Sequence, residues 1–223
     1  LPEHPHHVIQ RGNRRQETFF SDDDYRLYLE LVSGACRRHA TAVWAYCLMP
    51  NHVHLVMVPN DEDGLRASLG EAHRQYTRRI NFRNGWRGHL WQERFHSFPM
   101  DEMHLLSAVR YVEQNPVKAG LVRHPADWPW SSARAHLEGL DDELVRVRPM
   151  LDTVGDWASY LSAEISADDE SRIQRHARSG RPLGDPRFLE HAERLTGRPL
   201  KRGKPGAKPK GRSPKSGRKQ TRK

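Results

Sequence analysis

The pattern of hydrophobic and polar positions predicts alternating strands and helices over the first half of the chain. Runs rich in β-branched and aromatic residues, bounded by turn residues, predict strands at 7–10, 41–48, 53–58 and 90–100. Apolar residues at spacings of three and four predict helices at 21–39, 64–81 and 102–115. In chain order these elements are β-α-β-β-α-β, followed by one more helix.

That order is typical of a ferredoxin-like fold, an α+β arrangement in which an antiparallel sheet carries helices on one face. The strands at 41–48 and 53–58 are close enough in sequence to form an antiparallel hairpin. Ser21 and Asp101 are expected to cap the helices that follow them. Pro116 is expected to end the third helix, because proline has no backbone N–H to donate.

The composition changes twice along the chain and divides it into three parts. We expect a core domain over 1–123, which contains the ferredoxin-like elements. Residues 124–197 hold 9 basic and 14 acidic residues and several short helical patterns, which predict extra helices packed on the core. Residues 198–223 hold 12 Lys and Arg and no acidic residue. This tail has too little apolar surface to fold alone, so we expect it to be disordered.

The net charge of +9 comes from the tail, since 1–197 hold 25 basic against 28 acidic residues. Basic tails bind polyanions through the release of counterions, without sequence preference. Nucleic acid is therefore the expected partner, with Lys201, Arg202 and Lys204 as candidate contacts. A tail that only increases solubility is the alternative.

The rest of the composition excludes several classes of protein. Hydrophobic residues make up 36% of the chain and the mean hydropathy is −0.87. No apolar run approaches the about 18 residues that a membrane span requires. Cys36 and Cys47 fall in a predicted helix and a predicted strand, where they are interpreted as core residues and not as a disulfide or zinc site. We therefore expect a cytoplasmic protein without a membrane partner.

Two pairs of polar residues are candidates for a shared chemical site. His52 and His54 alternate along a predicted strand, so both imidazoles lie on one face of the sheet. Tyr111 and Asn115 are four residues apart in a predicted helix and also share a face. Together they could enclose a metal ion and a phosphate. The His spacing alone is weak, because 14 His in 223 residues give roughly one such pair by chance.

Longer motifs around these residues resemble a known family. The segment Pro50–Leu55 resembles the HUH signature of single-strand DNA endonucleases and transposases, in which two His flank one apolar residue. The segment Tyr111–Val122 resembles the single-tyrosine helix of REP-associated tyrosine transposases, which are IS200-like. Three further segments resemble the same family: Gln10–Arg14, Trp91–Phe95 and Trp128–Ser132. The matches are spread over about residues 6–135, in the expected order.

The resemblance implies a ferredoxin-like catalytic core that acts on single-stranded DNA. Tyr111 would attack the scissile phosphorus, leaving a 5′-phosphotyrosine and a free 3′-hydroxyl. His52, His54 and Asn115 would hold a divalent cation, either Mg²⁺ or Mn²⁺. The substrates in the family are repetitive extragenic palindromes (REP), which fold into hairpins. Glu113 is a poor candidate for the general base, because it lies two residues from Tyr111 and off its face.

The candidate DNA contacts lie in two segments. Arg11, Asn13, Arg14 and Arg15 form a turn at a predicted strand end, where they could bind phosphates or base edges. Arg94, beside the aromatic residues of its motif, could bind unpaired bases. The alternative for the turn is a solvated run of charge. The aromatic residues near Arg94, and Trp128 and Trp130, are interpreted first as core.

Two other functions stay open at this point. One is a nucleic-acid-binding module on the same fold without catalysis. The other is a metal nuclease that uses activated water, for which Tyr111 would be dispensable. A zinc-binding protein is the least favoured, because no Cys cluster supports it. One chain carries every named group, which favours a monomer, and a dimer is the alternative because related transposases exchange helices within dimers.

Overall fold

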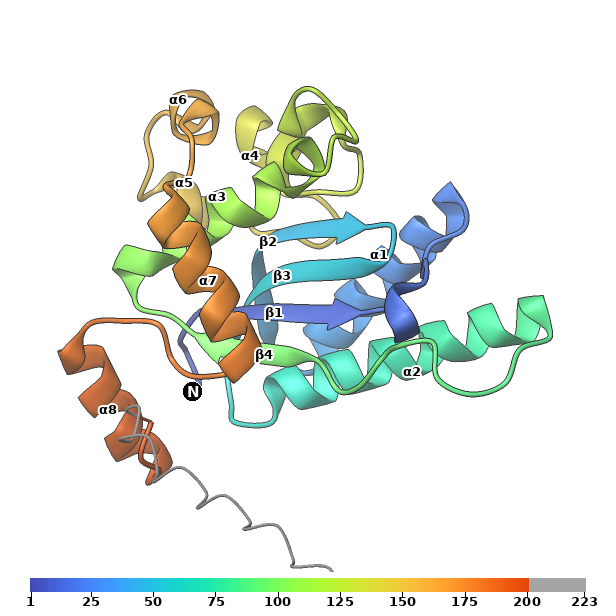
Figure 1. Cartoon of the computed structure of the whole chain (residues 1–223), viewed down its shortest axis with the longest axis horizontal. Helices are drawn as coiled ribbons and strands as arrows, with labels where there is room; N and C mark the ends of the chain where they lie inside the picture. Colours follow the sequence, from blue (N-terminus) through green and yellow to red (C-terminus); the bar gives the residue numbers. More distant parts are fainter. Residues whose placement is uncertain (201–223) are drawn as a thin grey trace, which may run out of the picture.

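The computed structural model describes residues 1–200 of the chain (Figure 1). Almost all of the basic tail, including Lys201, Arg202 and Lys204, lies outside the described residues. None of the helices in residues 1–200 is both long and apolar enough to cross a membrane.

A four-stranded antiparallel sheet forms the centre of the described chain. Its strands are β1 (His6–Arg11), β2 (Thr41–Met49), β3 (His52–Pro59) and β4 (His96–Pro99). They lie in the order β2-β3-β1-β4, with β2 and β3 joined as the predicted hairpin. This strand order, together with the helices that pack on the sheet, confirms the predicted ferredoxin-like α+β fold.

The fourth strand is shorter than the predicted 90–100. Trp91 makes one isolated bridge to Gly12 and is then buried by aromatic packing, with its ring 4.8 Å from that of His73. The chain between Trp91 and β4 is largely exposed and forms no regular strand, although the amide of Gln92 donates to the carbonyl of Arg11 at 2.9 Å. Anchoring of the Trp91 side chain in the core therefore replaces strand pairing at this point.

Two helices cover one face of the sheet, as predicted. They are α1 (Asp22–Arg38) and α2 (Gly64–Asn84), and their buried residues share a core with the strands. Tyr28 and Tyr76, both fully buried, lie in this core beside Leu55 of β3. Cys36 is also buried there, as expected from its helical position.

The opposite face of the sheet is covered by α3 (Glu102–Lys118) and by the extension (Figure 1). The carboxylate of Asp101 accepts a hydrogen bond from the backbone N–H of His104 at 2.9 Å, which confirms its predicted capping role. Ser21 stands at the N-cap of α1, but its side chain makes no capping bond. Both predicted residues therefore stand at the N-caps of their helices, but only Asp101 makes a capping hydrogen bond with its side chain.

Pro116 lies inside α3, so the prediction that it ends the helix was wrong. Proline removes one hydrogen bond, yet the following turn still forms because the amide of Ala119 donates to the carbonyl of Asn115 at 2.9 Å. The amide of Leu121 likewise donates to the carbonyl of Pro116. The missing bond is therefore tolerated near the helix end.

The extension consists of short helices, of which the first five pack on α3, on the sheet or on one another. They are η2 (Pro125–Asp127), α4 (Ala133–Glu138), α5 (Arg148–Leu151), α6 (Trp157–Ser162), α7 (Ala167–Ser179) and α8 (Pro186–Thr196). Trp157 and Ile173 are buried in the same core as Val109 of α3. The boundaries proposed at 123 and 197 stay a prediction.

Glu113 of α3 is fully buried and joins the tyrosine-bearing helix to the extension. Its carboxylate accepts hydrogen bonds from Ser132 Oγ at 2.5 Å, His136 Nδ1 at 2.6 Å and Trp157 Nε1 at 3.1 Å. The rings of His136 and Trp157 stack with centroids 4.2 Å apart. Three donors from two other segments therefore fix the position of α3 along its axis.

Replacing Glu113 by alanine is expected to lower the free energy of unfolding by about 3–5 kcal/mol, because buried donors lose their acceptor. Urea unfolding of the wild type and the variant measures the effect. Glu138→Ala, which removes an exposed carboxylate from α4, is the control and should change stability by less than about 0.5 kcal/mol. A loss below about 1 kcal/mol for Glu113→Ala would contradict a network that holds α3 in place.

Candidate active site

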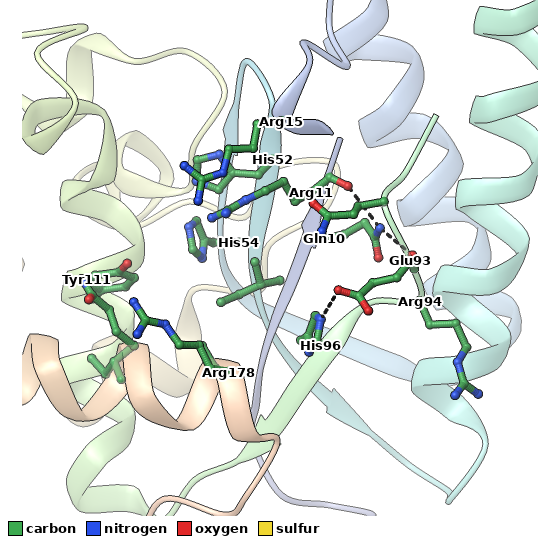
Figure 2. A pocket seen from close by; sticks show the side chains of 15 residues that line it. Gln10, Arg11, Arg15, His52, His54, Glu93, Arg94, His96, Tyr111 and Arg178 are labelled. Carbon is green, nitrogen blue, oxygen red and sulfur yellow. Dashed lines mark hydrogen bonds and ion pairs between the residues drawn. The ribbon is translucent and has the colours of Figure 1, made fainter. Parts of the chain in front are cut away.

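A cavity of about 650 Å³ opens on the sheet face that α3 covers (Figure 2). Its wall comes from β1, β3, the segment before β4, α3 and α7. Six residues predicted from the sequence line it: Arg11, Arg15, His52, His54, Arg94 and Tyr111. Asn13, Arg14 and Asn115 were also predicted and do not line it.

Strand alternation places both histidines toward this cavity. Val53 and Leu55 of β3 point into the core beneath α1 and α2, so His52 and His54 point to the other face. The rings of the two histidines lie 4.9 Å apart, and His54 is only 3% exposed. In the register of β1 and β3, His52 is paired with Arg11, which brings a guanidinium to the same end of the sheet.

Hydrogen bonds hold both imidazoles through Nδ1. His52 Nδ1 donates to Asn51 Oδ1 at 2.6 Å, while Asn51 Nδ2 donates to the carbonyl of Arg15 at 3.1 Å. His54 Nδ1 lies 3.0 Å from His7 Nε2. With a proton on Nδ1, each ring keeps the lone pair of Nε2 for a metal ion or a proton donor.

Burial lowers the pKa of all three imidazoles, because it disfavours the charged form. The pKa of His52 falls to about 4 and that of His7 to about 3, and the pKa of His54 falls well below its usual value. All three rings are therefore neutral near pH 7. A neutral imidazole is the form that binds a metal.

Tyr111 faces the histidines from α3. Its ring centroid lies 5.6 Å from that of His54 and 6.0 Å from that of His7. Burial raises the pKa of the Tyr111 phenol, as does the charge of Glu170, while hydrogen bonds from the side chains of Asn115 and Gln174 lower it. The phenol thus lies against two neutral imidazoles. Burial and the charge of Glu170 oppose its ionisation, and the side chains of Asn115 and Gln174 favour it.

Two imidazoles alone make an incomplete metal site. Within residues 1–200, no group of three or more His, Cys, Asp and Glu side chains is arranged to hold a metal ion. The amide of Asn115 uses Nδ2 to bond the carbonyl of Tyr111 at 2.8 Å, which leaves Oδ1 as a candidate ligand. Since Asn115 does not line the cavity, the two imidazole nitrogens fit a cation that completes its shell mainly with water or phosphate oxygens.

The basic turn η1 (Asn13–Arg15) is fastened at the mouth of the cavity. A Cβ on Gly12 would lie 2.3 Å from the carbonyl oxygen of Gln16, so this close turn requires glycine. Figure 2 shows Arg11 and Arg15 beside His52, whereas Arg94 points away from the histidines. Of the predicted contacts, Arg11 and Arg15 are therefore the best placed for a phosphate.

Sequence reasoning missed three side chains at the site: His7, Gln174 and Arg178. His7 gives one faint signal, a polar residue in a strand that is otherwise apolar at its centre. Gln174 and Arg178 lie about 60 residues beyond Tyr111, in a helix with ordinary amphipathic spacing. Only the packing of α7 reveals them.

Comparisons with known proteins identify the family of this chain. A family model described as "Transposase IS200 like" matches residues 2–115. A putative REP-associated tyrosine transposase of Haemophilus influenzae is 30% identical over 108 residues, which are 44% of this chain and 61% of that protein. A REP-associated tyrosine transposase of Escherichia coli is 25% identical over 126 residues, which are 56% of this chain and 73% of that protein.

A solved structure has the same fold. It is that of a REP-associated tyrosine transposase bound to a REP hairpin, with a TM-score of 0.54 and 22% sequence identity. The match covers 66% of this chain and 88% of the other. From the family model, its REP-associated relatives and the motifs around His52, His54 and Tyr111, the chain belongs to the family of IS200-like transposases.

Proposed function

We propose that the protein cleaves single-stranded DNA by attack of the Tyr111 phenolate on a phosphodiester. The observation that carries the proposal is the meeting of Tyr111, His52 and His54 in one cavity with Arg11 and Arg15 at its mouth. A nucleophile, nitrogen donors for a cation and guanidinium groups are what this reaction requires.

In the reaction, the phenolate oxygen of Tyr111 bonds to phosphorus and displaces the 3′-oxygen. The products are a 5′-phosphotyrosine and a free 3′-hydroxyl, so the reverse attack can rejoin DNA without a nucleotide cofactor. Mg²⁺ or Mn²⁺, held by His52, His54 and Asn115, would polarise the scissile phosphate. Arg11 and Arg15 would bind the backbone of the strand that enters the cavity.

The proposed substrate is hairpin DNA of the REP type. The names of the relatives support this choice, as does the solved relative described as bound to a REP hairpin. The basic sequence of 198–223 supports electrostatic contact with DNA. We propose action as a monomer at the nucleoid in the cytoplasm, since one chain supplies all the catalytic groups.

The test is incubation of the wild-type protein with hairpin oligonucleotides from palindromic repeats of its genome, labelled at either end, with Mg²⁺ or Mn²⁺. A denaturing gel that retains protein–DNA adducts should show the 3′-terminal fragment bound to protein and the 5′-terminal fragment free. Cleavage without an adduct would indicate water as the nucleophile. Binding without cleavage across several repeats would indicate the non-catalytic module.

A further inference from the structure

Helix α7 of the extension forms one wall of the cavity. Ile173, Gln174, Ala177 and Arg178 form two adjacent pairs one helical turn apart, and all four line the cavity. Ile173 is 1% exposed and belongs to the core between α3 and the sheet. The apolar part of this face therefore anchors α7, and its polar part borders the cavity.

Both ends of α7 are fixed to the catalytic core. Near its start, Glu170 pairs with Lys118 of α3 at 2.6 Å. After its end, Leu183 bridges Met100 in parallel orientation, and its amide donates to the carbonyl of Pro99 at 2.9 Å. Figure 1 shows the helix crossing β1 and β4 between these two attachments. The attachments hold the cavity-lining face of α7 in place.

Arg178 has no structural task in the described part of the chain. It is exposed and forms no ion pair within residues 1–200, whereas Arg172 of the same helix pairs with Asp168 at 2.7 Å. Figure 2 shows the Arg178 guanidinium directed toward Tyr111, across the cavity from Arg11. An unpaired guanidinium held beside a candidate nucleophile is suited to bind an anion there.

The charge of the cavity indicates which kind of anion Arg178 would bind. Among the described residues, four arginines line it, and the one acidic residue in its wall, Glu93, pairs with His96 at 2.9 Å. Two of these arginines, Arg11 and Arg178, lie on opposite sides of His54 (Figure 2). A phosphodiester passing between them would meet guanidinium groups from both sides, with the Tyr111 phenol within the same cavity.

We propose that α7 is a functional wall of the active site and that Arg178 binds the phosphate backbone of the DNA strand that Tyr111 attacks. This inference rests on the proposed function for its choice of substrate. Gln174, one turn before Arg178, lines the same cavity as Tyr111, and its side chain acts to lower the pKa of the Tyr111 phenol. The extension therefore supplies groups to the reaction, in addition to packing on the core.

The test compares Arg178→Ala, Arg178→Lys and the matched control Arg175→Ala. Arg175 lies on the same helix and is exposed, but it does not line the cavity. Its replacement by alanine removes the same charge from the helix without changing the cavity wall. At saturating hairpin DNA, Arg178→Ala should form the covalent adduct about 10²-fold more slowly than the wild type. Arg178→Lys should retain part of the rate, and Arg175→Ala should stay within about 2-fold.

Hairpin affinity, measured by fluorescence anisotropy without metal, separates this inference from the proposed function. Arg178→Ala should weaken binding about 10-fold relative to Arg175→Ala, even if the wild type forms no adduct and the proposed chemistry fails. Equal adduct rates and equal affinities for Arg178→Ala and Arg175→Ala would overturn the inference. Unchanged thermal unfolding of both variants would show that the exposed side chains are not needed for folding.

Discussion

Tyr111→Phe is expected to abolish the covalent protein–DNA adduct, with a loss of at least about 10³-fold, because the substitution removes only the attacking oxygen. The ring contacts of Tyr111 with His7 and His54 can persist in the variant. Hairpin affinity should therefore stay within about 3-fold of the wild type. The two measurements are the denaturing-gel assay and fluorescence anisotropy on the same oligonucleotide.

Tyr25→Phe is the matched control for this experiment. Tyr25 lies on the other face of the sheet, where its ring stacks on Trp130 at 4.7 Å. Removal of its hydroxyl should leave the adduct rate within about 2-fold of the wild type. If Tyr111→Phe still cleaves the hairpin at the wild-type rate, the nucleophile is water or another residue, and the proposed tyrosine chemistry is wrong.

The fold was predictable because local pattern and tertiary packing agree in the core. Alternation along 53–58 predicts that Val53 and Leu55 point inward, and it equally predicts that His52 and His54 point to the opposite face. The order of elements is typical of the ferredoxin-like topology, which the strand order confirms. In this region the local sequence pattern of each strand and helix agrees with the overall fold.

Local rules failed where a long-range contact decides the conformation. The segment after Leu90 has a strand-like composition, but it makes only one bridge, at Trp91, and the Trp91 ring packs against His73 and Tyr76. Pro116 fits a helix end by its chemistry, but lies near enough to the end of α3 for the next turn to form without its N–H. Neither outcome could be predicted from the composition of the segment alone.

The candidate site also combines residues that local pattern predicts with residues that only long-range packing brings in. Tyr111 and the two histidines follow from motif and periodicity, whereas His7 and Arg178 enter through strand register and helix packing. Glu113 is the informative case, since its position off the Tyr111 face correctly argued against a role as base. Its three buried donors show that the opposite side of the same helix is used to hold Tyr111 in place.

His54→Ala is expected to reduce metal-dependent adduct formation by about 10³-fold, because one of the two proposed imidazole ligands would be lost. Removal of divalent metal with a chelator should stop the wild-type reaction, and Mg²⁺ or Mn²⁺ should restore it. His124→Ala, at an exposed histidine that does not line the cavity, is the control and should not change the rate. Adduct formation that persists in excess chelator would contradict a metal role for His52 and His54.

His7 allows a finer version of the same experiment, because it contacts His54 without lining the cavity. If His7 Nε2 accepts the Nδ1 proton of His54, it keeps His54 Nε2 free for the cation. His7→Phe preserves a buried ring but removes the acceptor, and should raise the metal concentration for half-maximal rate about 10–100-fold. Saturating Mn²⁺ should then restore most of the rate, which a distorted active site would not allow. An unchanged metal requirement would show that the contact between His7 and His54 serves packing alone.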